Sequence, residues 1–194
     1  MRNIFILYMP VNNLEAMVHY EDTIKNRVRP ERIFRYTDQN LRARLTKIFG
    51  NRRIAVWGSR HSPSNRSRFE KMAIGDDVLI VEGDTVKLLG KVADKTINPD
   101  LSRELWKNIR GDTSEGWDLI YFIANPLEIE LQFSEFKKLL NYNPNYSLRG
   151  FTNVSSDKLE EFYSKYDDLY SILIRLKKGE KVEETSNVLA VDVE

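Results

Sequence analysis

The spacing of apolar residues divides the chain into short strands and amphipathic helices. Residues 2–8 form an almost unbroken apolar run, which predicts a first strand, and apolar positions recur at a helical spacing over residues 12–27. Residues 38–49 place four apolar side chains on one stripe, with Asp38 as the N-terminal cap and Gly50 as the end. The opposite face of this predicted helix is cationic.

The remaining elements follow in an irregular order. Further strands are predicted over residues 53–57, 77–82, 85–93, 117–124 and 127–131. Further helices are predicted over residues 64–73, 100–110, 134–141 and 156–178, the last broken near Asp167. Regular strand–helix alternation is absent, which argues against a doubly wound parallel sheet. We therefore predict an α+β fold, with a small curved mixed sheet or β-barrel and helices packed outside it.

Length and composition indicate one globular domain. The chain has 194 residues, of which 41% are hydrophobic and 30% charged, and we expect residues 1–178 to form the domain and residues 179–194 a polar tail or linker. No apolar run approaches the roughly 20 residues that span a bilayer, and the N-terminal run is too short for a signal peptide. Cysteine is absent, which excludes disulfides and thiolate chemistry and fits a cytoplasmic protein.

The charges are distributed unevenly. The net charge is only +1, yet residues 25–71 carry 14 lysines and arginines against three acidic residues, a balance of +11. A basic block of this size is typical of proteins that bind polyanions, although a solvated helix face could carry the same charges.

Known catalytic patterns do not occur. His19 and His61 are far apart and lack the spacing of metal ligands, and we expect His19 to be structural. Phosphate-binding glycine motifs, nucleophile elbows and the carboxylate–lysine cluster of nucleases are also missing. We therefore expect a binding domain with no catalytic residue, no metal and no cofactor, rather than an enzyme.

The most informative segment begins at Arg52. Trp57 ends a short predicted strand, and Gly58 and Ser59 follow it as a turn. An aromatic face beside cationic side chains suits a flat base and its phosphate, although core packing is the alternative for each tryptophan. The candidate phosphate-binding residues around this turn are Arg52, Arg53, Arg60 and Arg66.

Two stretches resemble known domains. The V-W-G-S run, Asn65, Phe69 and the G-D-D-V-L-I-V-E-G-D-T-V-K-L-L-G-K-V stretch resemble the central segment of YTH and EVE domains, which belong to the PUA-like superfamily. The later G-W-D-L-I-Y-F-I-A-N-P-L-E-I-E-L and N-Y-N-P-N-Y-S-L-R-G-F stretches resemble the N-terminal DNA-recognition domain of McrB-type, modification-dependent restriction GTPases.

The resemblance implies a pocket for a methylated base that is flipped out of DNA. Trp57 corresponds to the first wall of an aromatic cage, and the carbonyl of Gly58 to the acceptor for the base's exocyclic amine. Asn65 corresponds to a helix-opening position near the base, and the serine that follows the tryptophan in the family is displaced here to Ser59. The remaining implied contacts are Trp106 as the second wall, with Trp117 in reserve, and Arg149 at a phosphate.

The resemblance also implies partners. We expect modified double-stranded DNA, with N6-methyladenine favoured and methylcytosine possible. A fused GTPase motor and a separate nuclease subunit would complete a restriction system. The alternatives are an RNA-binding module that reads methylated adenine and a small nucleic-acid-processing enzyme.

Overall fold

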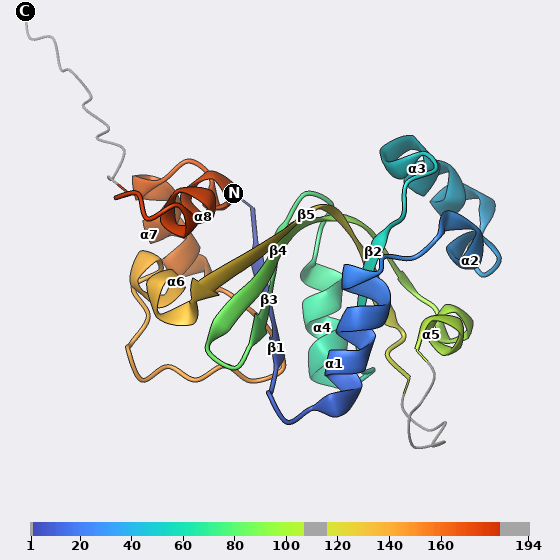
Figure 1. The fold of residues 1–194 in the computed structure, drawn as a ribbon, viewed down its shortest axis with the longest axis horizontal. Helices are drawn as coiled ribbons and strands as arrows, with labels where there is room; N and C mark the ends of the chain where they lie inside the picture. Colours follow the sequence, from blue (N-terminus) through green and yellow to red (C-terminus); the bar gives the residue numbers. More distant parts are fainter. Residues whose placement is uncertain (1, 107–115, 183–194) are drawn as a thin grey trace, which may run out of the picture.

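The structure is a computed structural model that describes residues 2–106 and 116–182. It has a single six-stranded mixed sheet, with helices on its outside (Figure 1). The strands are β1 (Ile4–Met9), β2 (Ala55–Ser59), β3 (Asp77–Glu82), β4 (Thr85–Ile97), β5 (Leu119–Gln132) and β6 (Phe151–Asn153). The helices are α1 (Leu14–Tyr20), the π-helix η1 (Glu21–Lys25), α2 (Pro30–Phe34), α3 (Gln39–Phe49), α4 (Pro63–Lys71), α5 (Pro99–Leu105), α6 (Phe133–Leu139), α7 (Ser156–Lys165) and α8 (Leu169–Lys177).

The strands run in the order β2-β5-β4-β3-β1-β6. Strands β1 and β3 pair in parallel, and every other pair is antiparallel. The two longest strands, β4 and β5, pair along most of their length with three shifts of register. Such bulges increase the local twist of a sheet and bend its strands. The predicted α+β class with a curled mixed sheet is therefore confirmed.

The two faces of the sheet pack into separate cores. Alternate residues of β1 show this directly, because Ile4 and Ile6 belong to one core while Phe5 and Leu7 belong to another. The helices α6, α7 and α8 cover one end of the sheet, α2, α3 and α5 lie at the other end, and α1 and α4 lie between (Figure 1). The described residues form three hydrophobic cores in all, the third of them around α2, α3 and α5. Strand β5 contributes to all three.

The boundary between the two strands expected over residues 117–124 and 127–131 is wrong, because both belong to β5. Asn125 and Pro126 separate the two predicted strands, and residues of these types usually interrupt a strand. Here Asn125 takes a left-handed conformation (φ 49°), and the pairing slips between Leu89 and Lys91 of the neighbouring strand. Proline has no N–H to donate to a neighbouring strand, and a sheet tolerates it where the pairing is interrupted in this way.

Several other boundaries were predicted closely. Helix α3 is capped by Asp38, whose side chain accepts from Leu41 N–H, and ends at Gly50, as expected. The C-terminal helix is broken between α7 and α8, near Asp167. The end of the helix expected over residues 100–110 and most of the expected tail lie outside the described residues. None of the described helices is long and apolar enough to cross a membrane.

Candidate nucleic-acid interface

Trp57 lies inside strand β2, at the edge of the sheet. The strand continues to Ser59, so the expected turn directly after Trp57 is wrong: Gly58 and Ser59 pair with Ile120 and Leu119 of β5. Trp57 itself pairs with Tyr121, and only 3% of its surface is exposed. The tryptophan therefore faces the interior of the curled sheet.

The other two tryptophans converge on Trp57. Trp106 follows the last residue of α5, and Trp117 comes two residues before β5. The ring centroids of Trp57 and Trp117 are 5.5 Å apart, and those of Trp106 and Trp117 are 6.1 Å apart. The sequence left open which of the two stands beside Trp57, and the structure brings both into one group.

At Gly58 the backbone lies close to these rings. A Cβ atom at this position would lie 2.7 Å from Cη2 of Trp106 and 2.7 Å from the carbonyl oxygen of Trp117. A side chain of any size would thus displace Trp106 or the chain at Trp117. The glycine permits a close approach, as expected, and the group that approaches in this structure is Trp106.

His19 completes the group, and sequence reasoning missed it. Its ring centroid lies 4.6 Å from that of Trp117 at an interplanar angle of 83°, and 5.5 Å from that of Trp106. We call Trp57, Trp106, Trp117 and His19 the aromatic cluster. A sequence signal was present, because Glu15, His19 and Thr23 repeat at four-residue spacing and so form a polar stripe on one face of the helical segment.

Burial controls the chemistry of His19. Only 2% of its surface is exposed, and desolvation lowers its pKa from 6.5 to about 4, partly opposed by the charge of Glu15. The imidazole is therefore neutral at physiological pH, with one donor and one acceptor nitrogen. Neither nitrogen has a hydrogen-bond partner among the described residues, and the same is true of Nε1 of Trp117.

Trp106 is connected to the helix segment that carries His19. Its Nε1 donates to Oγ1 of Thr23 at 3.2 Å, and that hydroxyl donates to the carbonyl oxygen of His19 at 2.9 Å. The two bonds fix Trp106 relative to the backbone of α1 and η1.

Ser59 and Asn65 lie on either side of the loop after β2. The hydroxyls of Ser59 and Tyr121 are 3.5 Å apart, and burial raises the pKa of Tyr121 well above its usual value. The side-chain amide of Asn65 donates to the carbonyl oxygen of Arg60 at 2.9 Å and so fixes this loop.

The cap of α4 is Ser62, with Pro63 in the first turn, so the predicted start of this helix at Ser64 or Asn65 is wrong.

The candidate phosphate-binding arginines also have contacts within the protein. Arg52 donates to the carbonyl oxygens of Ile48 and Phe49 at the end of α3, and Arg53 donates to those of Asn26 and Arg27.

The other three candidates lie on the loop after β2, on α4 and before β6. Arg60 forms an ion pair with Glu15 (2.7 Å), and Arg66 forms one with Glu70 (2.9 Å). Arg149 is exposed directly before Gly150 and β6. The side chains of Arg60 and Arg66 remain about half exposed, at 50% and 51%. They can therefore still meet a phosphate.

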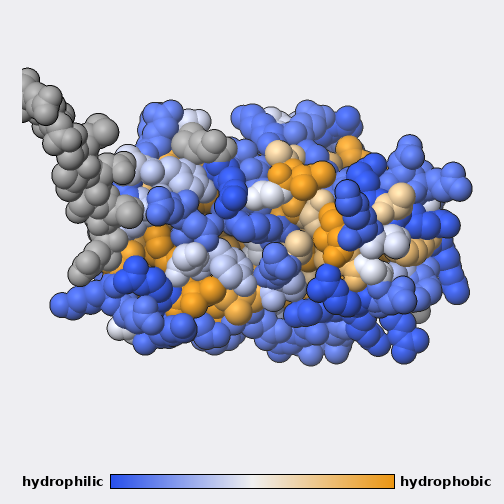
Figure 2. Space-filling model, turned by 90° about the horizontal axis from the view of Figure 1, so that it is seen from above, coloured by the Kyte–Doolittle hydropathy of each residue, from blue (hydrophilic) through white to orange (hydrophobic). Residues whose placement is uncertain are grey.

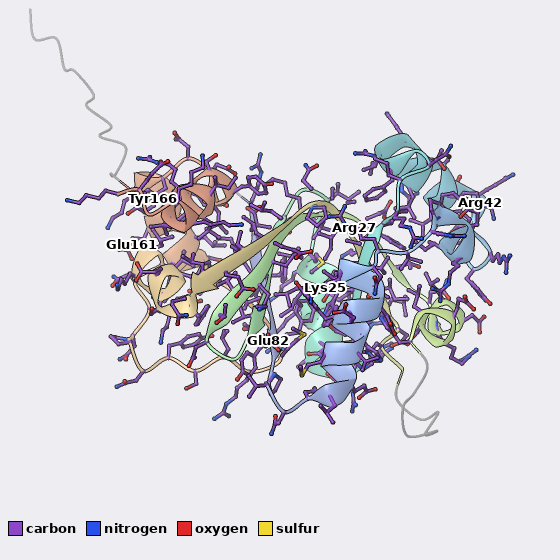
Figure 3. The ribbon with its side chains drawn as sticks, viewed as in Figure 1. Lys25, Arg27, Arg42, Glu82, Glu161 and Tyr166 are labelled. Carbon is purple, nitrogen blue, oxygen red and sulfur yellow. The ribbon has the colours of Figure 1, made fainter. Side chains whose placement is uncertain are left out.

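The surface charge follows the arrangement of helices. In Figure 3, Arg42 lies among the helices at one end of the sheet, whereas Glu161 and Tyr166 lie at the other end. Six of the 14 basic residues of the basic block lie on α3 and α4, and six others lie outside the helices, on the segments that connect the elements. Figure 2 shows one face covered mostly by hydrophilic residues, with hydrophobic ones in separate patches between them.

Comparison with known proteins gives a match by structure. No known protein family matches the sequence, and no curated protein is significantly similar to it. The N-terminal domain of Thermococcus gammatolerans McrB, solved bound to m5C DNA, superposes with a TM-score of 0.62 at 16% sequence identity. The match covers 90% of this chain and 99% of that one. In fold, and over nearly its whole length, this chain therefore resembles the N-terminal domain of McrB.

Proposed function

We propose that this chain binds DNA by receiving a methylated base, turned out of the duplex, in the aromatic cluster. The observation that carries the proposal is the convergence of all three tryptophans of the chain at one point of the curled sheet. The solved neighbour of the same fold was bound to m5C DNA, which supports the choice of a methylated base in DNA.

Energetic considerations are consistent with such a site. Flipping a base out of a duplex costs a few kcal/mol, and stacking one on an aromatic side chain returns roughly 1–3 kcal/mol. A methyl group buried among aromatic rings adds about 0.8 kcal/mol. Phosphate contacts from arginines such as Arg60 and Arg66 supply affinity that does not depend on sequence.

The aromatic cluster is closed in this structure. Trp57 and Trp106 expose 3% and 5% of their surface, and the imidazole of His19 lies beside both Trp106 and Trp117. A base can therefore enter only if the rings move apart. Trp117 is the half-buried tryptophan of the three and precedes the first residue of β5 by two positions, so it is the wall with the most freedom to move.

Among methylated bases we place 5-methylcytosine first. The sequence alone favoured N6-methyladenine, but the structural neighbour was solved with m5C DNA. We also propose that the chain binds without catalysis, as the recognition domain of a restriction system in which a GTPase motor and a nuclease subunit do the remaining work.

A binding panel tests this function. Matched duplexes with one 5-methylcytosine, one N6-methyladenine or no modification, and the corresponding single-stranded RNAs, are titrated at about 150 mM salt, where phosphate contacts are partly screened. We expect a methylated duplex to bind about fourfold more tightly than the plain one, which corresponds to about 0.8 kcal/mol from the buried methyl group. Equal affinity for methylated and plain duplexes would overturn the proposal. Tighter binding of methylated RNA would replace DNA with RNA as the ligand.

A further inference from the structure

His19 is a buried polar side chain. An apolar side chain at the same position would avoid the cost of burying polar atoms without hydrogen-bond partners. Each buried polar atom without a partner costs about 1–3 kcal/mol, and His19 has two such atoms among the described residues. Its nearest charged neighbours do not relieve this cost, because Glu15 pairs with Arg60 on the loop after β2. Trp117 adds a third unpartnered atom, its indole Nε1, on a ring 4.6 Å from the imidazole.

These unpartnered atoms, on two rings in edge-to-face contact, have a defined chemical pattern. The neutral imidazole has an acceptor nitrogen, and the indole Nε1 is always a donor. The complementary ligand edge has a donor beside an acceptor. Cytosine has this pattern in its exocyclic amine and N3, and adenine has it in its amine and N1. Thymine has the reverse pattern, a carbonyl beside an N–H.

The distinction from thymine matters for any reader of 5-methylcytosine. Thymine carries the same methyl group on the same ring and is present throughout DNA. A cluster that recognised only a flat ring and a methyl group would accept thymine equally well. A polar contact to the base edge is therefore needed, because a site with buried hydrogen-bonding groups rejects an analogue that leaves them unpaired.

We propose that His19 is that contact: its acceptor nitrogen receives the exocyclic amine of the flipped base, while Nε1 of Trp117 donates to the adjacent ring nitrogen. The inference rests on the proposed function and assigns the base edge that the aromatic cluster reads. The imidazole can exchange its two tautomers, but the indole cannot. Thymine's N–H therefore faces a fixed donor in either tautomer.

The test compares two duplexes that differ only at the base edge. One contains a 5-methylcytosine·guanine pair, and the other a thymine·guanine mismatch at the same position. The mismatched thymine is the easier base to flip, so a protein without an edge contact should bind it at least as well. We expect the unaltered protein to prefer the 5-methylcytosine duplex by at least tenfold and His19→Phe to lose that preference.

Two further variants separate base reading from packing. His19→Gln keeps a donor and an acceptor and should retain part of the preference. Val18→Thr, at a neighbouring position that is 43% exposed on the same helix, should retain all of it. Imidazole nitrogen NMR signals of the unaltered protein provide a readout that needs no variant. Adding the 5-methylcytosine duplex should shift the signal of the acceptor nitrogen of His19.

The outcomes separate this inference from the proposed function. If the unaltered protein does not distinguish 5-methylcytosine from plain cytosine and the N6-methyladenine duplex also binds like its plain control, the proposed function fails and takes the role of His19 with it. If methylated DNA is preferred but His19→Phe still discriminates against thymine, or the nitrogen signal does not move, only the role of His19 is overturned.

Discussion

At the scale of single residues, His19 is a polar side chain that is buried at an energetic cost. It lies against two tryptophans, it is 2% exposed, and its nitrogens have no hydrogen-bond partner in the described part of the chain. Trp57 is similarly buried, so Trp57→Ala would remove core packing at a cost of about 3–5 kcal/mol. Trp117 is therefore the better position at which to probe the aromatic cluster.

The burial of His19 predicts a dependence of stability on pH. Its pKa is about 4 in the folded protein and 6.5 in the unfolded chain, so the unfolded state takes up a proton first as the pH falls. The free energy of unfolding should therefore decrease between pH 6.5 and pH 4. Urea unfolding at pH 7 and pH 5 should show the unaltered protein losing about 1–2 kcal/mol more than His19→Phe. An equal loss in both proteins would contradict the burial of a neutral His19.

At the scale of elements, the sequence predicted strands and helices better than it predicted their ends. Asp38 and Gly50 bound helix α3 as expected, because capping and termination depend on the residues themselves. The ends of β2 and β5 were missed because pairing with neighbouring strands carries both strands through residues that usually interrupt them. Gly58 continues β2 beside Ile120, and Asn125 and Pro126 lie within β5.

Only part of the candidate site could be predicted from the sequence, because contacts between distant segments depend on the fold. The three tryptophans were recognised as candidates from their residue type and neighbours, and the structure brings them together. His19 was assigned a structural role because helical spacing alone does not reveal that a polar side chain meets Trp106 and Trp117 across the fold. The arginines were chosen for their charge, and their contacts with backbone carbonyls and carboxylates could not be predicted without the fold.

The loop after β2 and helix α4 carry a prediction about phosphate binding. Arg60→Gln and Arg66→Gln together should weaken binding to methylated and plain DNA equally, because phosphates carry no base information. The slope of log affinity against log salt should become shallower by about 0.9 for each phosphate that the variant no longer neutralises. Lys165→Gln and Lys177→Gln, on α7 and α8, make the same change of charge at the end of the sheet that α6, α7 and α8 cover. This pair should leave the slope unchanged. Equal effects from both pairs would show that net charge alone matters.

At the scale of the whole molecule, one curled sheet separates two regions. The helices α6, α7 and α8 pack into their own core, whereas α2, α3 and α5 pack into the core that also contains Trp106. The aromatic cluster lies where the core that contains Trp106 meets the core that contains Trp57. Under the proposed function, the part that holds the aromatic cluster contacts DNA, and the part covered by α6, α7 and α8 stabilises the sheet.

The ratio of the dissociation constants for plain and 5-methylcytosine duplexes, in the unaltered protein and in Trp117→Ala, tests the central claim most directly. Trp117 is half-buried, so its removal costs less stability than removal of Trp57. We expect a ratio of about four in the unaltered protein, equivalent to about 0.8 kcal/mol from the buried methyl group. In Trp117→Ala the ratio should fall to about one while affinity for the plain duplex is unchanged, because phosphate contacts supply that affinity. A ratio that stays high in Trp117→Ala would contradict a base-binding role for the aromatic cluster.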